Sequence, residues 1–185
     1  MWFSTDQILY MKNQYPIVYN IAVIGGSTAD IKYREISLEV GHILAERHAT
    51  VICGGMTGVM EWVAQGVSEA GGTIIGILPV YSTTSGNRFL TFRLPTGIGY
   101  ARNFLIIRAA DAVIAIDGAT GTMSEAAFAL TEGKSVIVIG DLGIDHTKKD
   151  DGIMFHADSA KEAVDLALRE AEKHRLNQEP PDMDS

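Results

Sequence analysis

A turn at residues 117–125, with the sequence DGATGTMSE, combines glycines with hydroxyl and carboxyl side chains at the spacing of an anion-binding site. A glycine turn that leads into a helix leaves free backbone N–H groups at the positive end of that helix, where phosphates bind. The same segment also fits a capping box, with Thr122 as N-cap and Glu125 bonding back to it. A phosphate site and a purely structural turn are therefore both open. The expected phosphate-binding residues are Gly118, Ala119, Thr120, Gly121 and Thr122.

Four arginines lie in a segment that contains no acidic residue. Between Glu69 and Asp111 the chain has no Asp or Glu, although its net charge is −8. Guanidinium groups match the oxygens of phosphate and carboxylate, so the segment predicts a pocket for a negatively charged small molecule. Surface pairing with acids from other segments is the alternative. The four residues are Arg88, Arg93, Arg102 and Arg108.

Strand-like and helix-like segments alternate along the chain and must position these residues. Short β-branched runs predict buried strands at 18–24, 50–53, 73–78, 92–94, 112–116, 135–139 and 153–157. Apolar residues at three- and four-residue spacing predict helices at 31–47, 59–70, 100–110 and 122–132, and a last helix after the capping box that starts at Ser159. This alternation predicts an α/β fold: a doubly wound, mostly parallel, Rossmann-like sheet with helices on both faces.

The chain length of 185 residues suits one domain. We place this domain at 17–173, after an N-terminal extension at 1–16 and before a polar C-terminal tail at 174–185. The single cysteine, Cys53, cannot form an intrachain disulfide, which is typical of cytoplasmic proteins. The acidic net charge disfavours nucleic-acid and anionic membrane partners, and no apolar run reaches membrane-spanning length.

Three predicted strands end in glycine-containing turns. Because the carboxyl ends of parallel strands meet at one edge, we expect these turns to share a ligand site where the strand order reverses. The third turn is the one at 117–125, and the arginine segment connects it to the second. From the first two turns the expected ligand contacts are Gly25, Gly26, Ser27, Gly54, Gly55, Met56 and Thr57.

Several other kinds of site are disfavoured by their missing motifs. The first turn, GGSTAD, is not the dinucleotide fingerprint, and the chain has no GxxxxGK[ST] phosphate loop and no GxSxG nucleophile elbow. The five histidines show no metal spacing with Cys53, so no metal site is predicted.

Three ordered motifs resemble the Lonely Guy-like Rossmann superfamily, whose members are often labelled lysine decarboxylases. They are GGMTGVME at 54–61, ARN at 101–103 and GATGTMSE at 118–125. The similarity extends over residues 18–172 and is greatest to the small branch that includes the molybdenum cofactor carrier proteins. Nothing in the chain suggests a pyridoxal-phosphate site, so lysine decarboxylation is not expected.

The resemblance implies binding of a nucleoside 5′-monophosphate and hydrolysis of its N-glycosidic bond, without a resident cofactor. It implies catalytic roles for Arg102 and Glu125 and a ligand contact for Asn103. Related proteins assemble through helices that flank the site, so a homodimer or homotetramer is expected. The chain departs from the family signature PGGxGTxEE at three positions: Asp117 replaces the proline, Ala119 the second glycine and Ser124 the first glutamate.

The loss of one of two carboxylates leaves a second function open. The same anion site could carry the molybdenum cofactor, a pterin phosphate, or a nucleotide as cargo without cleaving it. A regulatory nucleotide sensor is the third option. Hydrolysis is favoured by the retained pair Arg102 and Glu125, and carriage by the missing glutamate.

Overall fold

The computed structural model describes residues 17–118, 120–144 and 152–177. The predicted N-terminal extension at 1–16, the residues of the predicted tail from 178 onward, and Ala119 of the predicted phosphate turn lie outside this range.

Within the described residues the strands form one parallel sheet of seven, in the order β4-β3-β2-β1-β5-β6-β7. The chain runs outward from β1 to β4, then returns to place β5 on the other side of β1. The strand order therefore reverses between β1 and β5, as the doubly wound prediction requires. The strands are β1 (Asn20–Gly25), β2 (Thr50–Cys53), β3 (Thr73–Leu78), β4 (Phe92–Pro95), β5 (Ala112–Ile116), β6 (Val136–Ile139) and β7 (Met154–His156).

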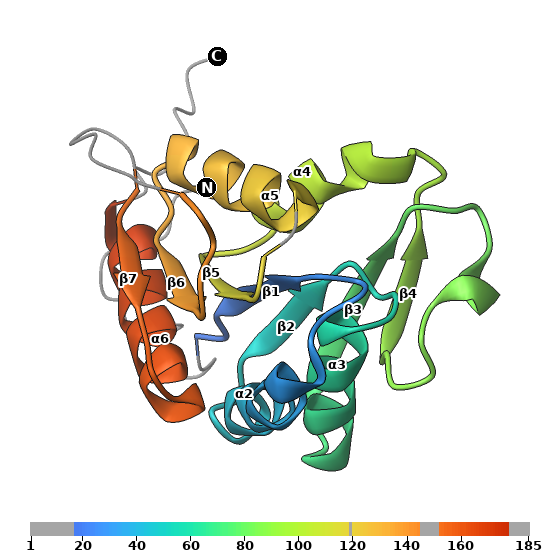
Figure 1. Ribbon diagram of the computed structural model, residues 1–185, viewed down its shortest axis with the longest axis horizontal. Helices are drawn as coiled ribbons and strands as arrows, with labels where there is room; N and C mark the ends of the chain where they lie inside the picture. The colour runs from blue at the N-terminus through green and yellow to red at the C-terminus, as the bar shows by residue number, and fades with distance from the viewer. Residues whose placement is uncertain (1–16, 119, 145–151, 178–185) are drawn as a thin grey trace, which may run out of the picture.

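Helices cover both faces of the sheet, which confirms the predicted three-layer architecture. In Figure 1, α4 (Arg102–Arg108) and α5 (Thr120–Thr131) lie along one face, and the remaining α-helices of the described residues lie on the opposite face. Each face has its own apolar core, separated from the other by the sheet. The opposite layer is made of α2 (Arg34–Glu46), α3 (Val59–Glu69) and α6 (Ala160–Asn177), and short 3-10 turns are η1 (Ile31–Tyr33), η2 (Thr83–Ser85) and η3 (Gly99–Ala101).

The centre of the sheet is packed tightly at the end of β1. All five residues of β5 are buried, as expected for β-branched and small residues in a strand covered on both sides. Gly25 pairs with Ile116, and a Cβ on Gly25 would come within 2.6 Å of both the Ile116 carbonyl oxygen and the Val59 side chain. A glycine is therefore required where β1, β5 and α3 meet.

The predicted start of α5 is wrong by two residues. The helix begins at Thr120, so Thr122 lies inside its first turn and is not the N-cap of a capping box. Its side chain is buried, and the Ser124 hydroxyl donates to the Gly121 carbonyl oxygen at 2.7 Å. Thr120 and Gly121 have low intrinsic helix propensity, which tertiary context overrides here, so the helix begins earlier than the turn-like sequence indicated.

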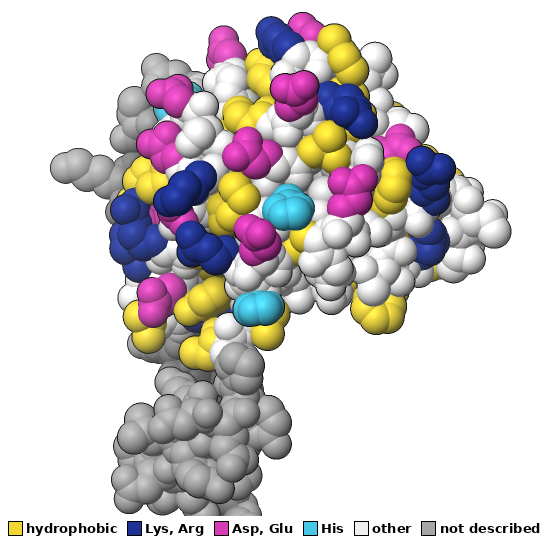
Figure 2. Space-filling view, turned by 90° about the horizontal axis from the view of Figure 1, so that it is seen from below, with side chains coloured by type: hydrophobic (Ala, Val, Ile, Leu, Met, Phe, Trp, Pro, Cys, Tyr) yellow, Lys and Arg dark blue, Asp and Glu magenta, His cyan; other side chains and the backbone are white. Residues whose placement is uncertain are grey.

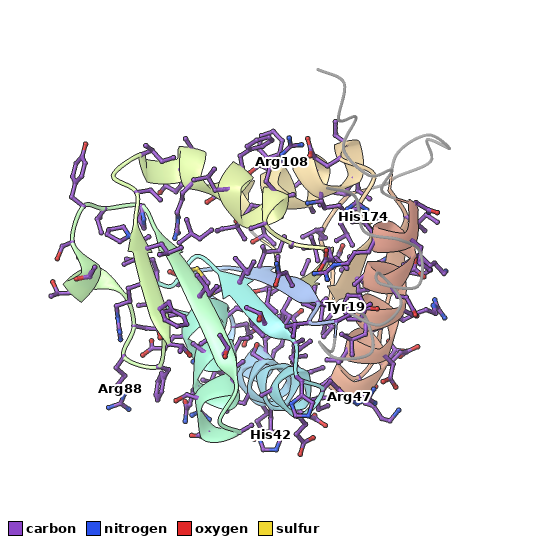
Figure 3. The ribbon with its side chains drawn as sticks, turned by 180° about the vertical axis from the view of Figure 1, so that it is seen from behind. Tyr19, His42, Arg47, Arg88, Arg108 and His174 are labelled. Atoms are coloured by element: carbon purple, nitrogen blue, oxygen red, sulfur yellow. The ribbon has the colours of Figure 1, made fainter. Side chains whose placement is uncertain are left out.

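The end of α6 also lies beyond the predicted domain boundary. The helix continues to Asn177, so residues 174–177 belong to the folded domain and not to a tail. Arg175 donates from Nε and Nη2 to the two Asp111 carboxylate oxygens, at 2.8 and 2.6 Å. The same carboxylate accepts from the Asn20 backbone N–H at 2.7 Å, and the Arg175 guanidinium lies over the Tyr19 ring. Figure 3 shows Tyr19 beside α6, the helix that carries His174.

We expect Asp111→Asn to lower the free energy of unfolding by about 2 kcal/mol, because it breaks a bidentate pair and weakens the bond to β1. Urea denaturation measures the loss. Lys161→Ala, on the helix that carries Arg175, is the control, since its ion pair with Asp165 is exposed and should contribute less than about 0.5 kcal/mol. Equal effects of the two substitutions would contradict the prediction.

The outer face of the α2, α3 and α6 layer carries acidic and basic side chains side by side (Figure 2). Several of them pair, as Arg47 of the α2 C-cap does with Asp165 of α6 at 2.8 Å. This face therefore lacks the continuous basic surface of a nucleic-acid-binding site. Among the described residues, no helix is long and apolar enough to cross a membrane.

Candidate functional site

A hollow of about 260 Å³ opens at the carboxyl ends of β1 and β5, where the strand order reverses. This is the position expected for a ligand site in a doubly wound sheet. It brings together predicted residues from the β1 turn, α4 and α5. They are Gly25, Gly26, Ser27, Arg102, Asn103, Thr120, Gly121, Thr122 and Glu125.

Five predicted contacts do not line this hollow: Gly54, Gly55, Met56, Thr57 and Gly118. Two lining residues were missed by the sequence analysis. Met60 lies at helical spacing among the core residues of α3, so its pattern indicated packing. Tyr100 had a usable signal, since it stands two residues before Arg102 at the start of the helix predicted at 100–110.

Arg102 is held in place by backbone oxygens at the carboxyl ends of β2 and β3. Its side chain is only 7% exposed, and Nη1 donates to the backbone oxygens of Gly54 and Ile77. Its Nε is fully buried and has no hydrogen-bond partner among the described residues. The guanidinium is thus a fixed, buried positive charge with unused donor capacity beside the hollow.

Gly54 makes room for this arginine. A Cβ at Gly54 would lie 2.8 Å from Nη2 of Arg102 and 2.6 Å from Sδ of Met60. Gly54, which was predicted as a ligand contact, therefore packs against the guanidinium of Arg102. Its contact with a ligand stays a prediction.

The expectation of a pocket lined by several arginines holds for Arg102 alone. Arg108 forms an exposed ion pair with Glu132, Arg93 donates to the Asn87 carbonyl oxygen at 2.9 Å, and Arg88 lies over the Phe89 ring. Figure 3 shows Arg88 and Arg108 at separate edges of the molecule. Arg108 thus shows the alternative, pairing with an acidic residue of another segment, whereas Arg93 contacts a backbone oxygen and Arg88 an aromatic ring.

Glu125 reaches the hollow from the second turn of α5. Its side chain is 7% exposed and makes no hydrogen bond or ion pair with any described residue. Burial raises the pKa of the Glu125 carboxyl to about 7, and the positive charge of Arg102 opposes that rise. A carboxyl group with this pKa can accept and release a proton at neutral pH, as general acid–base catalysis requires.

The first turn of α5 supplies the anion-binding part of the hollow. Thr120, Gly121 and Thr122 all line it, and a Cβ on Gly121 would meet no atom within 4 Å. The first N–H groups of a helix have no partner within that helix and lie at its positive end. A phosphate group bound here would accept hydrogen bonds from these N–H groups.

The turns after β1 and β2 are bonded to each other. The Thr57 hydroxyl donates to the Ser27 carbonyl oxygen at 3.0 Å, and the Val59 N–H donates to the Gly26 carbonyl oxygen at 3.1 Å. From the other side, Asn87 donates its backbone N–H to Gly55 and its side-chain amide to Met56. The connection between β3 and β4 is therefore tied to the second turn.

We expect Gly58→Ala to cost about 3 kcal/mol or more of stability. Gly58 has φ of +68°, and an added Cβ would lie 2.3 Å from the Gly26 carbonyl oxygen, which is backbone and cannot rotate away. Gly71→Ala is the matched control, because φ is +70° but nothing lies within 4 Å. It should cost about 1 kcal/mol, and urea denaturation that gave both variants the same loss would refute the predicted clash.

The amino-acid sequence matches the model of the SLOG cluster4 family over residues 18–165. It is 34% identical over 141 residues to a cytokinin riboside 5′-monophosphate phosphoribohydrolase of Arabidopsis thaliana. That match covers 69% of this chain and 59% of the enzyme, so the chain spans less than two thirds of that relative's length.

Two solved structures share the fold over nearly their whole length. The molybdenum cofactor binding protein of Rippkaea orientalis has a TM-score of 0.77 and 29% identity, covering 84% of this chain and 98% of that protein. The molybdenum cofactor carrier protein of Chlamydomonas reinhardtii has a TM-score of 0.72 and 26% identity, covering 83% and 99%. The chain therefore belongs to the SLOG cluster4 family, in a Lonely Guy-like branch that includes molybdenum cofactor carrier proteins.

Proposed function

We propose that the protein binds a nucleoside 5′-monophosphate at this hollow and hydrolyses its N-glycosidic bond. One observation carries the proposal: Arg102 and Glu125, each only 7% exposed, face one hollow at the N-terminus of α5 without an ion pair between them. Burying two charged groups is costly unless each has a partner. A phosphorylated, polar ligand would provide these partners.

In this arrangement the 5′-phosphate lies at the first turn of α5, where the free N–H groups of Gly121 and Thr122 are available. The ribose then lies beside Glu125, and Arg102 orients the substrate from the other side of the hollow. The proposal assigns no role to Arg88, Arg93 or Arg108, which bind other partners.

The chemical step needs one water molecule. Its oxygen bonds to C1′ of the ribose as the bond from C1′ to the base nitrogen breaks, and the bonding pair leaves with the base. The transition state carries positive charge on the ribose, as in glycoside hydrolysis, and the Glu125 carboxylate stabilises it. Glu125 takes the proton from water and returns it to the departing base, so the products are free base and ribose 5-phosphate.

A single carboxyl group can perform both transfers because its pKa is about 7. One carboxyl group is therefore sufficient for the reaction, although the first glutamate of the family signature is absent. Ser124, which replaces it, is exposed and donates to the Gly121 backbone, so it contributes no second carboxylate.

Carriage of a pterin phosphate is the second candidate function. It is favoured by that same replacement and by the molybdenum cofactor proteins that share the fold. In a carrier the hollow would hold the phosphate and leave the cargo intact. The two functions use the same residues and differ in their product.

Incubation with each nucleoside 5′-monophosphate, followed by chromatography, tests the proposal. Hydrolysis predicts equal amounts of free base and ribose 5-phosphate. The opposite result is intact nucleotide in every incubation together with tight binding of molybdopterin, and it would establish carriage instead.

A further inference from the structure

Tyr100 stands at the rim of the hollow with its side chain 88% exposed. It belongs to η3, two residues before Arg102. Single exposed aromatic residues are common on protein surfaces and need no explanation by themselves. Tyr100 differs from the equally exposed Tyr81 because it lines the hollow, whereas Tyr81 packs over Gly97.

The backbone that carries Tyr100 is fixed. Three N–H groups of the preceding segment donate to backbone oxygens at the end of β3 and just after it: Thr96 to Leu78, Gly97 to Val80 and Gly99 to Pro79, at 3.0 to 3.1 Å. The ring is therefore free in solvent while its attachment point is held. Such an arrangement presents a flat apolar surface at a defined place, with little to reorganise on binding.

The size of the hollow requires a ligand of nucleotide size to reach this rim. Its volume of about 260 Å³ is below the roughly 300–1,000 Å³ of sites that enclose a whole drug-sized ligand. The polar groups that suit phosphate and ribose lie at the first two turns of α5 and at Arg102. With that end anchored, a ring system that extends across the opening can reach Tyr100.

We propose that Tyr100 is the stacking surface for the base of the bound nucleoside 5′-monophosphate and so determines selection for a flat heterocycle over a bare sugar phosphate. This inference rests on the proposed nucleotide site, although it does not need hydrolysis. Base–aromatic stacking tolerates any flat ring, because every base has a π-face. The tyrosine hydroxyl contributes nothing essential, so phenylalanine should serve equally well.

The test compares two ligands that differ only in the ring: adenosine 5′-monophosphate and ribose 5-phosphate. Dissociation constants are measured by calorimetry on the full-length chain carrying Glu125→Gln, so that turnover does not remove the nucleotide. Tyr100→Ala should weaken binding of the nucleotide about tenfold and change binding of ribose 5-phosphate less than about twofold. Tyr100→Phe and the matched control Tyr81→Ala should retain the parent affinities.

Equal weakening of both ligands, or no weakening of the nucleotide, overturns the inference. So does a Tyr100→Ala variant that changes the subunit number while both affinities stay constant, because the ring would then contact a second copy. Failure of the proposed hydrolysis gives a different result from failure of the stacking role of Tyr100. In that case the unaltered chain binds adenosine 5′-monophosphate and releases no adenine, while the effect of Tyr100→Ala on affinity persists.

Discussion

Replacing Glu125 with Gln is expected to slow the release of free base by about a thousandfold, the size typical of a lost general acid–base group. Gln keeps the shape of the side chain but can neither accept the proton from water nor stabilise positive charge on the ribose. Nucleotide affinity should change much less than the rate. In the unaltered protein, the rate of base release should rise with pH, with a midpoint near pH 7, because Glu125 acts in its ionised form.

The same substitution should stabilise the fold at high pH. Burial raises the pKa of Glu125 from about 4.5 to about 7, so the folded protein holds this proton more tightly than the unfolded chain. Stability from this group is fully present below pH 4.5 and is lost as pH rises through 7. Gln carries no charge and escapes that loss, so Glu125→Gln should gain about 3 kcal/mol over the unaltered protein at pH 8.

Urea denaturation at pH 4 and pH 8 measures this difference, which should be near zero at the lower pH. Glu39→Gln is the control, since Glu39 is exposed on α2 and should change stability by less than about 0.5 kcal/mol at either pH. A Glu125→Gln variant with the same stability as the unaltered protein at both pH values would show that Glu125 ionises normally. It would then be unsuited to the proposed proton transfers.

The sheet could be predicted because each central strand has a local sequence pattern that indicates a buried strand. The runs at 50–53, 73–78 and 112–116 are short and rich in β-branched residues, and they agree with β2, β3 and β5. Strands buried on both faces need such runs whatever surrounds them. Since the strands are parallel, their carboxyl ends lie at one edge of the sheet. The strand prediction therefore also gave the edge at which the hollow lies.

The site was predicted less completely because its geometry depends on contacts between distant segments. Gly54, predicted as a ligand contact, lies against the guanidinium of Arg102, which arrives from α4 nearly fifty residues later. The local sequence around Gly54 or Arg102 does not indicate that contact. Arg175 likewise looked like part of a polar tail, although it pairs with Asp111, 64 residues earlier in the chain.

Asp117 illustrates a substitution whose consequence is visible only in the structure. The family signature has proline at this position, and proline requires φ near −65°. Asp117 has φ of +54°, a conformation that aspartate tolerates and proline cannot adopt. The connection from β5 to α5 therefore takes a backbone path here that the proline of the signature would not allow.

Replacing Arg102 with Met is expected to weaken binding of a nucleoside 5′-monophosphate by about ten- to a hundredfold, the size of a lost hydrogen bond to a charged group. It should also move the pH midpoint of base release above 7, because Arg102 now lowers the pKa of Glu125 and that opposing charge would be gone. Arg108→Met is the control on the same helix, since its pair with Glu132 is exposed, and it should alter neither quantity.

Arg102→Lys separates charge from shape and guards against a poorly folded Met variant. Lysine keeps the positive charge but cannot reproduce the planar guanidinium that donates to both Gly54 and Ile77. We therefore expect weaker nucleotide binding with the midpoint retained near pH 7. Calorimetry and the pH dependence of base release measure the two effects. If both variants folded and bound nucleotide as tightly as the unaltered protein, Arg102 would be a structural brace for the strand ends and the ligand would have to lie elsewhere.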